Sequence, residues 1–240
     1  MAKTIGHNLG RLVLGDSATV RLAVSEDAGR YLFGSKPFEV VNNGIDTKRF
    51  RFDSAARLRV REQYGIPKDA LLFGSVGRIA EAKNPLFQLR VFAEVLKLEP
   101  TAFYLLVGDG DLRYQTKELA EELGIINRVI MPGYTTDPAA IYSALDCFLM
   151  PSLYEGLAMV CIEAQCSGCP IICSEALPSE SRITDAEIQL CLSEGEEAWA
   201  RQAVLLAKTS RNRTHYSIQV TDAGFDADGT AKRLAQILAC

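Results

Sequence analysis

Short apolar runs alternate with amphipathic segments along most of this sequence. Apolar runs near residues 71, 103, 129, 146, 170 and 188 predict buried strands, and segments of about 10 to 14 residues between them predict helices. Strands that alternate with helices form parallel sheets with right-handed crossovers. We therefore expect an α/β fold, a Rossmann-like parallel sheet flanked by helices, with a ligand crevice at the carboxyl ends of the strands.

Two glutamates, Glu155 and Glu163, stand eight positions apart within residues 151–170, PSLYEGLAMVCIEAQCSGCP. The preceding apolar run ends at this segment, and Gly156 breaks the pattern before an apolar helix begins. Glu155 is therefore expected in a loop and Glu163 on the helix, too far apart to form a close catalytic dyad. In a chain with 30 acidic residues such a spacing also arises by chance, with one loop carboxylate and one solvated helix carboxylate.

The backbone amides between these glutamates favour an anion. They belong to Gly156, Leu157 and Ala158, near the predicted helix start, where unpaired N–H groups and the helix dipole create positive potential. Carboxylates bind hydroxyl groups and amides bind phosphate. The segment therefore predicts a site for a sugar nucleotide.

Two cations follow the first strand of the predicted sheet. The segment LLFGSVGRIAEAKN predicts a strand that ends in a glycine, followed by a loop with Arg78 and Lys83. A helix is expected next, capped by Asn84 with Pro85 at its first position. By themselves the two cations also fit an ordinary surface loop.

Two further segments repeat this plan. AFYLLVGDGDLR, residues 102–113, predicts a strand, a glycine turn and Asp111 as the cap of a helix that ends near Gly124. NRVIMPGYTTDPAAIYSALD predicts a strand over residues 129–132 and a helix that begins at Asp137.

In this order the segments resemble those of the retaining, nucleotide-sugar-dependent glycosyltransferases of the GT-B fold, family 4. The glutamates match the E-x7-E signature of that family, and Arg78 and Lys83 match its G-R…K-N segment. The matched segments run from VVNNGIDTKRF at residues 40–50 through GSVGRI, LLVGDG, MPGY, YEGLAMVCIEA and IICSEALPSE to AGFDADG at residues 223–229. The resemblance implies half of a GT-B hexosyltransferase, which transfers a sugar from a nucleotide-diphosphate sugar to an acceptor hydroxyl with retention.

The resemblance also implies a role for each candidate residue. Arg78 and Lys83 would hold the donor diphosphate, together with the amides of residues 156–158. Glu163 would accept hydrogen bonds from the ribose, and Glu155 would contact hydroxyls of the donor sugar.

Two residues after the third predicted strand are candidates for the nucleobase. The resemblance places Tyr134 and Thr135 near the base, although Tyr134 also fits simple packing against a neighbouring helix. Members of this family generally need no metal, and no cofactor is expected beyond the donor substrate.

The resemblance further implies a two-domain enzyme of which this chain carries mainly the second domain. Residues 1–36 are expected to be the end of the N-terminal acceptor domain, with a helix, a strand around residues 20–24 and a short helix. Residues 37–226 are expected to form the nucleotide-sugar-binding domain, and residues 227–240 a C-terminal helix. Because most of the first domain is missing by this comparison, we expect the chain alone to bind the donor weakly and to catalyse little transfer.

Two other functions also fit these features. One is a sugar-nucleotide epimerase of the same fold, which needs no acceptor. The other is a non-catalytic subunit that binds a sugar nucleotide and pairs with a separate N-terminal domain. The segment LPSESRITDAEIQLCLSEGEEAWA resembles bacterial capsular and exopolysaccharide transferases, so an acceptor sugar or a lipid-linked oligosaccharide in polysaccharide biosynthesis is the implied partner.

Charge and hydropathy argue against several other classes. With 26 basic and 30 acidic residues the net charge is −4, which does not favour a nucleic-acid surface. The basic cluster of Arg57, Arg59 and Arg61 is expected on the solvated side of a helix. No apolar run is long enough to span a bilayer and no secretion signal is present, so a cytoplasmic protein with at most peripheral contact at the inner membrane face is expected.

Cysteine usage does not favour a metal site. Cys166 and Cys169 have C-x2-C spacing, with Cys161 and Cys173 nearby. Because Cys161 and Cys166 are expected on a helix and the other two in the next strand, the four do not converge as zinc requires. Neither histidine lies near a motif, so small buried thiols are the prediction.

Overall fold

The computed structural model describes residues 19–239 of the 240-residue chain. These residues divide into two compact units. The smaller unit contains residues up to Asp46 together with those from Gly224 onward, and the larger unit is Thr47–Ala223. Each unit is described by itself.

The larger unit is built around one parallel sheet. Its strands are β3 (Leu72–Val76), β4 (Phe103–Val107), β5 (Val129–Gly133), β6 (Cys147–Met150), β7 (Ile171–Ser174) and β8 (Glu187–Leu190). They lie in the order β5-β4-β3-β6-β7-β8, and all neighbours are parallel. Counted from β3 this is the 3-2-1-4-5-6 order of doubly wound folds, in which the chain changes direction between the first and fourth strands. The switch point therefore lies between β3 and β6.

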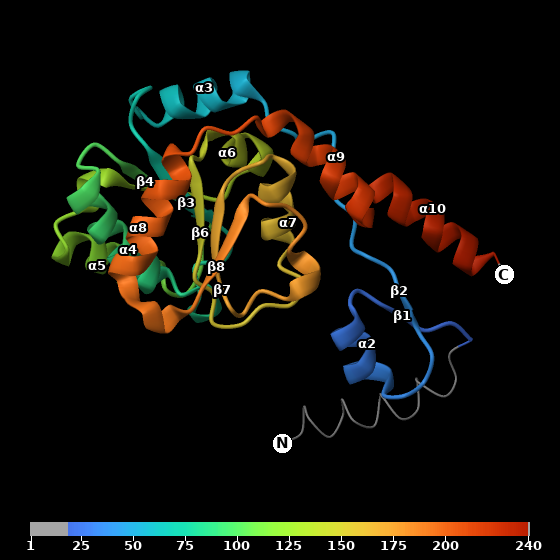
Figure 1. Ribbon diagram of the computed structural model, residues 1–240. Helices are drawn as coiled ribbons and strands as arrows, with labels where there is room; N and C mark the ends of the chain where they lie inside the picture. Colours follow the sequence, from blue (N-terminus) through green and yellow to red (C-terminus); the bar gives the residue numbers. More distant parts are fainter. Residues whose placement is uncertain (1–18, 240) are drawn as a thin grey trace. The chain divides into compact units, whose positions relative to one another are not determined.

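Helices cover both faces of this sheet (Figure 1). α4, α5 and α8 pack together on one face, while α6 and α7 cover the other, with α3 against α6 and α9 against α7. The bounds are α3 (Ser54–Gln63), α4 (Pro85–Leu98), α5 (Arg113–Glu122), α6 (Pro138–Ala144), α7 (Met159–Cys166), α8 (Gly195–Lys208) and α9 (Tyr216–Val220). Short 3-10 turns occupy Glu81–Lys83, Ile126–Arg128, Ser179–Ser181, Leu192–Glu194 and Arg213–His215.

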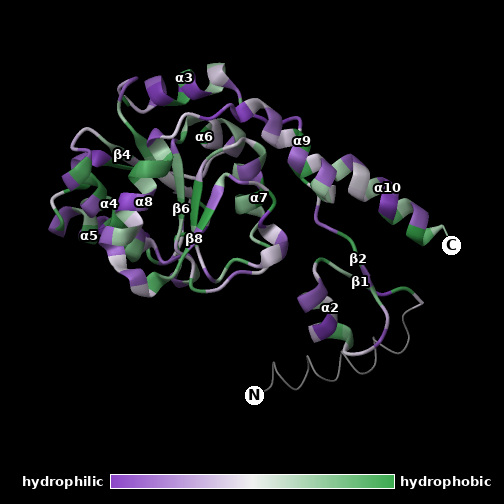
Figure 2. Cartoon of the chain, in the orientation of Figure 1, coloured by the Kyte–Doolittle hydropathy of each residue, from purple (hydrophilic) through white to green (hydrophobic). Residues whose placement is uncertain are grey.

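Aromatic and aliphatic side chains fill the layer between the sheet and α4 and α8. Trp199 of α8 is fully buried, and its ring meets Phe87 edge-on with centroids 5.5 Å apart. Phe92 packs against Tyr104, whose hydroxyl donates to Gln88 Oε1 at 2.9 Å. Figure 2 shows hydrophobic residues on the central strands and on α6 and α7, while α3, α4, α5 and α8 carry hydrophilic residues among hydrophobic ones. Burial of this apolar surface is the main stabilising term of the unit.

The smaller unit pairs two short strands. β1 (Leu22–Ala23) runs parallel to β2 (Glu39–Val40), with α2 (Glu26–Phe33) between them in the chain. A second helix, α10 (Ala227–Leu238), begins after Asp226, whose carboxylate accepts from the amide of Gly229. The strand expected around residues 20–24, the short helix after it and the C-terminal helix are therefore confirmed. The first helix expected in residues 1–36 lies outside the described residues.

The basic cluster predicted to be solvated is mostly a structural ion-pair network. Arg57 and Arg61 each reach Asp146 at 2.6 Å, one on each carboxylate oxygen. The side chain of Arg61 is only 4% exposed, and burial lowers its pKa. Arg59 alone is exposed as predicted. The prediction failed because the sequence does not reveal that α3 faces a carboxylate 85 residues further along the chain.

Two predicted helix caps also differ from the structure. Asn84 does precede α4, with Pro85 in the first turn, but its side chain makes no capping hydrogen bond. The residue before α5 is Leu112, not Asp111, and no side chain caps this helix. Asp111 instead pairs with Arg78, from the loop after β3, and this ion pair competes with capping for the carboxylate.

Candidate functional site

Loops from both sides of the switch point meet at the carboxyl edge of the sheet. Lys83 follows β3 and Glu155 follows β6, and Lys83 Nζ lies 2.5 Å from Glu155 Oε1. The pair is shielded from solvent, with side chains 23% and 8% exposed, respectively. Two residues that the sequence placed in one site are thus brought into direct contact.

Hydrogen bonds to the main chain hold the two loops together beside this ion pair. A 3-10 turn over Glu81–Lys83 is held at one end by Gln88, whose side-chain amide donates to the carbonyl of Lys83 at 2.8 Å. The amide of Leu153, in the loop after β6, donates to the carbonyl of Ala82 at 2.8 Å. The two loops are therefore joined by main-chain hydrogen bonding next to the ion pair.

Arg78 is positioned at the end of β3 by the close approach of neighbouring strand ends. The amide of Gly77 donates to Val107, the last residue of β4, at 3.0 Å, and Gly108 donates to Gly133 of β5 at 2.8 Å. Arg78 itself reaches Asp111 Oδ2 at 2.8 Å, with both side chains mostly exposed. An exposed pair of this kind contributes little stability and is easily exchanged for another anion.

Glu163 makes a separate set of contacts on α7. The buried hydroxyl of Tyr142, on α6, donates to Glu163 Oε2 at 2.8 Å. Burial raises the pKa of Glu163 above its usual value, whereas the Tyr142 hydrogen bond and the charge of Arg49 lower it. Desolvation is the largest of these effects, so this carboxyl is a weaker acid than an exposed glutamate.

The amides of Gly156, Leu157 and Ala158 precede α7 as predicted. Ala158 stands at the N-cap position in the left-handed region, with φ of 38°. Within residues 19–239 these amides donate to no protein acceptor. They are therefore available to bind an anion at the start of the helix.

Tyr134 and Thr135 lie in the loop that follows β5. Tyr134 is 82% exposed, so the alternative that it packs against a neighbouring helix is wrong. The hydroxyl of Thr135 accepts from the backbone amide of Asp137. The carboxylate of Asp137 in turn caps α6 by accepting from the amide of Ala140. The loop is thus shaped locally, and the tyrosine ring is free of packing constraints.

Two site residues were not singled out from the sequence, Tyr142 and Arg49. Tyr142 lies in an apolar helix and has the pattern of an ordinary core aromatic. Arg49 donates to the carbonyl of Thr136 at 2.9 Å and acts electrostatically on Glu163. The packing of α6 on α7 brings Tyr142 to this carboxylate, and the fold of the segment before α3 brings Arg49 within electrostatic reach of it.

Five of the six cysteines within residues 19–239 are buried free thiols, as predicted, whereas Cys191 is an exposed free thiol. Cys161 and Cys173 donate to the two oxygens of Glu187 at 3.6 and 3.4 Å, and burial raises the pKa of both thiols. Cys169 precedes β7 rather than opening it. Within the described residues, no three histidine, cysteine or acidic side chains form a cluster suited to a metal ion.

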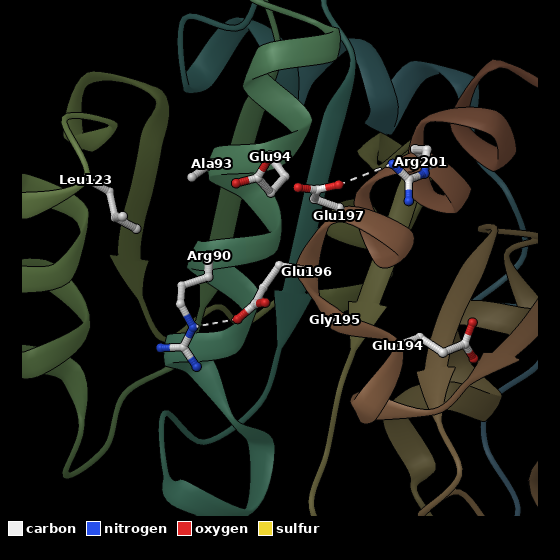
Figure 3. A pocket seen from close by; sticks show the side chains of 9 residues that line it. All are labelled: Arg90, Ala93, Glu94, Leu123, Glu194, Gly195, Glu196, Glu197 and Arg201. Atoms are coloured by element: carbon white, nitrogen blue, oxygen red, sulfur yellow. Dashed lines mark hydrogen bonds and ion pairs between the residues drawn. The ribbon is translucent and has the colours of Figure 1, made fainter.

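A separate cavity of about 510 Å³ lies where α8 begins (Figure 3). Arg90 of α4 crosses to Glu196 of α8 at 2.8 Å, and Glu197 pairs with Arg201. None of the candidate donor residues lines this cavity. Its lining contains two arginines and four glutamates, so its net charge is negative, which does not suit a diphosphate.

Comparison with known proteins agrees with the architecture and the motifs. A family model described as glycosyl transferases group 1 matches residues 56–219, which is more than half of the chain. The chain belongs to this family. The match includes the loops that carry Arg78, Lys83 and Glu155, and the helix α7 that carries Glu163.

Curated relatives extend the similarity. The putative glycosyltransferase EpsF of Bacillus subtilis is 34% identical over 238 residues, which cover 95% of this chain and 61% of that protein. The UDP-Gal:alpha-D-GlcNAc-diphosphoundecaprenol alpha-1,3-galactosyltransferase of Escherichia coli is 32% identical over 143 residues, covering 56% of this chain and 36% of that protein. The chain thus spans less than two thirds of the length of these relatives.

Solved structures show the same fold. HepE of Anabaena in complex with UDP-glucose superimposes with a TM-score of 0.79 at 20% identity, over 97% of this chain and 67% of that one. The predicted α/β fold of a GT-B glycosyltransferase half is confirmed. Within the described residues, no helix has the length and apolar character needed to cross a membrane.

Proposed function

We propose that this chain supplies the donor-binding half of a retaining, family 4 glycosyltransferase that uses a nucleotide-diphosphate sugar. The observation that supports this most is the Lys83–Glu155 pair at the switch point between β3 and β6. In doubly wound folds ligands bind at this point, outside the carboxyl ends of the strands. A shielded cation and carboxylate there match a substrate with both phosphate and hydroxyl groups.

In this proposal each part of the donor has its own contacts. Arg78 and Lys83 neutralise the charge that builds on the departing diphosphate, and the amides of residues 156–158 add hydrogen bonds to it. Glu155 orients hydroxyls of the donor sugar and stays beside Lys83. Glu163 accepts from the ribose. No metal or other cofactor is used, because the cations supply the positive charge.

The nucleobase is proposed to lie near Tyr134 and Thr135. The exposed tyrosine ring offers a face for stacking. HepE was solved with UDP and with UDP-glucose, and a relative in Escherichia coli is named for UDP-Gal, so UDP is the first nucleotide to test.

The acceptor is proposed to be a sugar or a lipid-linked oligosaccharide in polysaccharide biosynthesis. This rests on relatives whose names refer to polysaccharide or to a diphosphoundecaprenol-linked sugar. It is a proposal for the whole protein rather than for this chain's residues alone.

The Glu163→Gln substitution tests the ribose contact. We expect UDP to bind this variant at least about tenfold more weakly, because hydrogen bonds to a charged acceptor are lost. Isothermal titration calorimetry of the wild-type chain and the variant measures the difference. The raised pKa of Glu163 adds a second expectation. As the pH falls, UDP affinity should decline earlier than it would with an ordinary glutamate.

The control for this experiment is Glu121→Gln. Glu121 is on α5, exposed, and paired only loosely with Lys117 at 3.7 Å. The Glu121→Gln substitution should leave UDP binding unchanged. Failure of the wild-type chain to bind UDP or any other nucleoside diphosphate, or equal binding by Glu163→Gln, would refute the proposed site.

Asp111→Asn is expected to strengthen diphosphate binding. In the structure Asp111 occupies the guanidinium of Arg78 and adds a negative charge beside the proposed phosphates. Since the pair is exposed, the gain should be modest, about two- to fivefold in UDP affinity. Titrations at low and high salt measure it, and the gain should shrink at high salt. Unchanged or weaker binding at low salt would show that Arg78 does not meet the diphosphate.

A further inference from the structure

We propose that Tyr142 is a positioning residue for Glu163, and that its hydroxyl sets the carboxylate to receive a ribose diol. This inference rests on the proposed function, since it deepens the role given to Glu163. Tyr142 contacts the carboxylate and not the substrate. Its contribution is therefore to the orientation and ionisation of another side chain.

The hydrogen bond occupies one oxygen of the Glu163 carboxylate and leaves the other oxygen open to a ligand. Tyr142 donates to Oε2 at 2.8 Å, and within residues 19–239 no donor reaches Oε1. An ionised carboxylate has about four lone-pair directions, so Oε1 remains able to accept from a hydroxyl. The bond also fixes the rotation of the terminal carboxylate torsion, which is otherwise broad.

Tyr142 is itself held rigidly. Its side chain is completely buried, and its ring lies between Phe50 and Phe148, with centroids 6.1 and 5.7 Å away. Arg213 donates to its backbone carbonyl at 2.7 Å. A hydroxyl mounted on so constrained a ring is preorganised, so little entropy is lost when it orients Glu163.

Because the Tyr142–Glu163 pair is partly buried, the carboxylate needs a hydrogen-bond donor to stay ionised. Glu163 is partly removed from water, which favours its neutral form, and a neutral carboxyl would be a poorer acceptor for a diol. Tyr142 and Arg49 act against that effect by favouring the ionised form. On the tyrosine side, the buried thiols of Cys161 and Cys169 are the other titratable neighbours, and burial holds the pKa of Tyr142 well above its usual value. The phenol therefore remains a donor throughout the ordinary pH range.

The test is Tyr142→Phe, which removes one oxygen and keeps the ring contacts. We expect UDP binding to weaken by roughly tenfold, since a hydrogen bond to a charged group is lost. Binding of 2′,3′-dideoxy-UDP, which lacks the diol, should change by less than about twofold, because the oriented carboxylate has no hydroxyls to receive. Calorimetry with both nucleotides on both proteins gives the comparison.

Two further readouts separate positioning from a structural role. In the Glu163→Gln background, Tyr142→Phe should have little additional effect on UDP affinity, because the two residues act through one interaction. In the wild-type background, the affinity ratio of variant to wild type should fall further as the pH decreases. The reason is that loss of the hydroxyl raises the pKa of Glu163, which is then protonated at a higher pH.

Tyr104→Phe is the matched control. Tyr104 is equally buried and donates to Gln88 Oε1 at 2.9 Å, between α4 and β4 and without contact to Glu163. It should lower the melting temperature about as much as Tyr142→Phe and leave UDP affinity unchanged.

The outcomes distinguish this inference from the proposed function. If wild type binds UDP and Glu163→Gln weakens it, but Tyr142→Phe has no effect or weakens both nucleotides equally, the positioning role is wrong while the ribose contact stands. If Glu163→Gln itself has no effect, the proposed function fails first, and the positioning role fails with it.

Discussion

Replacing Asp146 by alanine is expected to lower the free energy of unfolding by about 3–5 kcal/mol, because it leaves buried positive charge without a partner. Asp146 stands just before β6. One carboxylate oxygen receives Arg57, and the other receives both Arg61 and the amide of Leu72 at 2.7 Å. Since Arg61 is nearly inaccessible, water cannot replace the lost carboxylate. Denaturant unfolding followed by circular dichroism measures the change.

The same substitution in an exposed pair provides the control. Asp111→Ala removes the partner of Arg78, and both of these side chains are more than half exposed. Its effect on unfolding should be below about 1 kcal/mol. Similar losses for the two variants would contradict the view that burial, and not ion pairing itself, makes Asp146 important.

Replacing Gly108 by alanine is expected to cost at least about 3 kcal/mol and to abolish measurable UDP binding, because strain and overlap each cost on the order of 1–3 kcal/mol. A Cβ at this position would lie 1.8 Å from the carbonyl oxygen of Gly77, and φ is +133°. The backbone that must move carries Arg78, so the proposed diphosphate contact is displaced as well. Thermal unfolding and UDP calorimetry measure the two effects.

Gly124→Ala separates backbone strain from steric overlap. Gly124 follows α5 with φ of +70°, and a methyl group added there would meet no other atom within 4 Å. This variant should lose only about 1–2 kcal/mol, the usual cost of the left-handed region, and keep its UDP affinity. If Gly108→Ala behaves in the same way, the close approach of the β3 and β4 ends does not constrain the site.

Most of the fold follows from local pattern. The strands of the large sheet occur at the predicted places because five of them, β3 to β7, are short apolar runs followed by glycine, proline or a polar residue, while β8 alternates polar and apolar residues. Pro85 and Asp137 mark real helix starts. The predicted cap Asp111 failed because its carboxylate pairs with Arg78, and Asn84, which precedes α4 in the left-handed region, makes no side-chain capping bond.

The sequence predicted which residues belong to the candidate site, but not which of them contact one another. Loops at the strand ends are local features, and parallel topology brings their carboxyl ends to one edge. The pairing of Lys83 with Glu155 is not local, since the residues are 72 positions apart. Likewise, Tyr142 has the sequence pattern of a core residue, and its bond to Glu163 depends on how α6 meets α7.

The strands, the helices, the parallel sheet and the polar residues at its edge follow from the amino-acid sequence, because they depend on periodicity and on residues close in the chain. Which charges are buried and which side chains meet depends instead on strand order. Placing β6 beside β3 brings Glu155 to Lys83 and Asp146 to the arginines of α3. Desolvation then gives these long-range pairs their energetic weight.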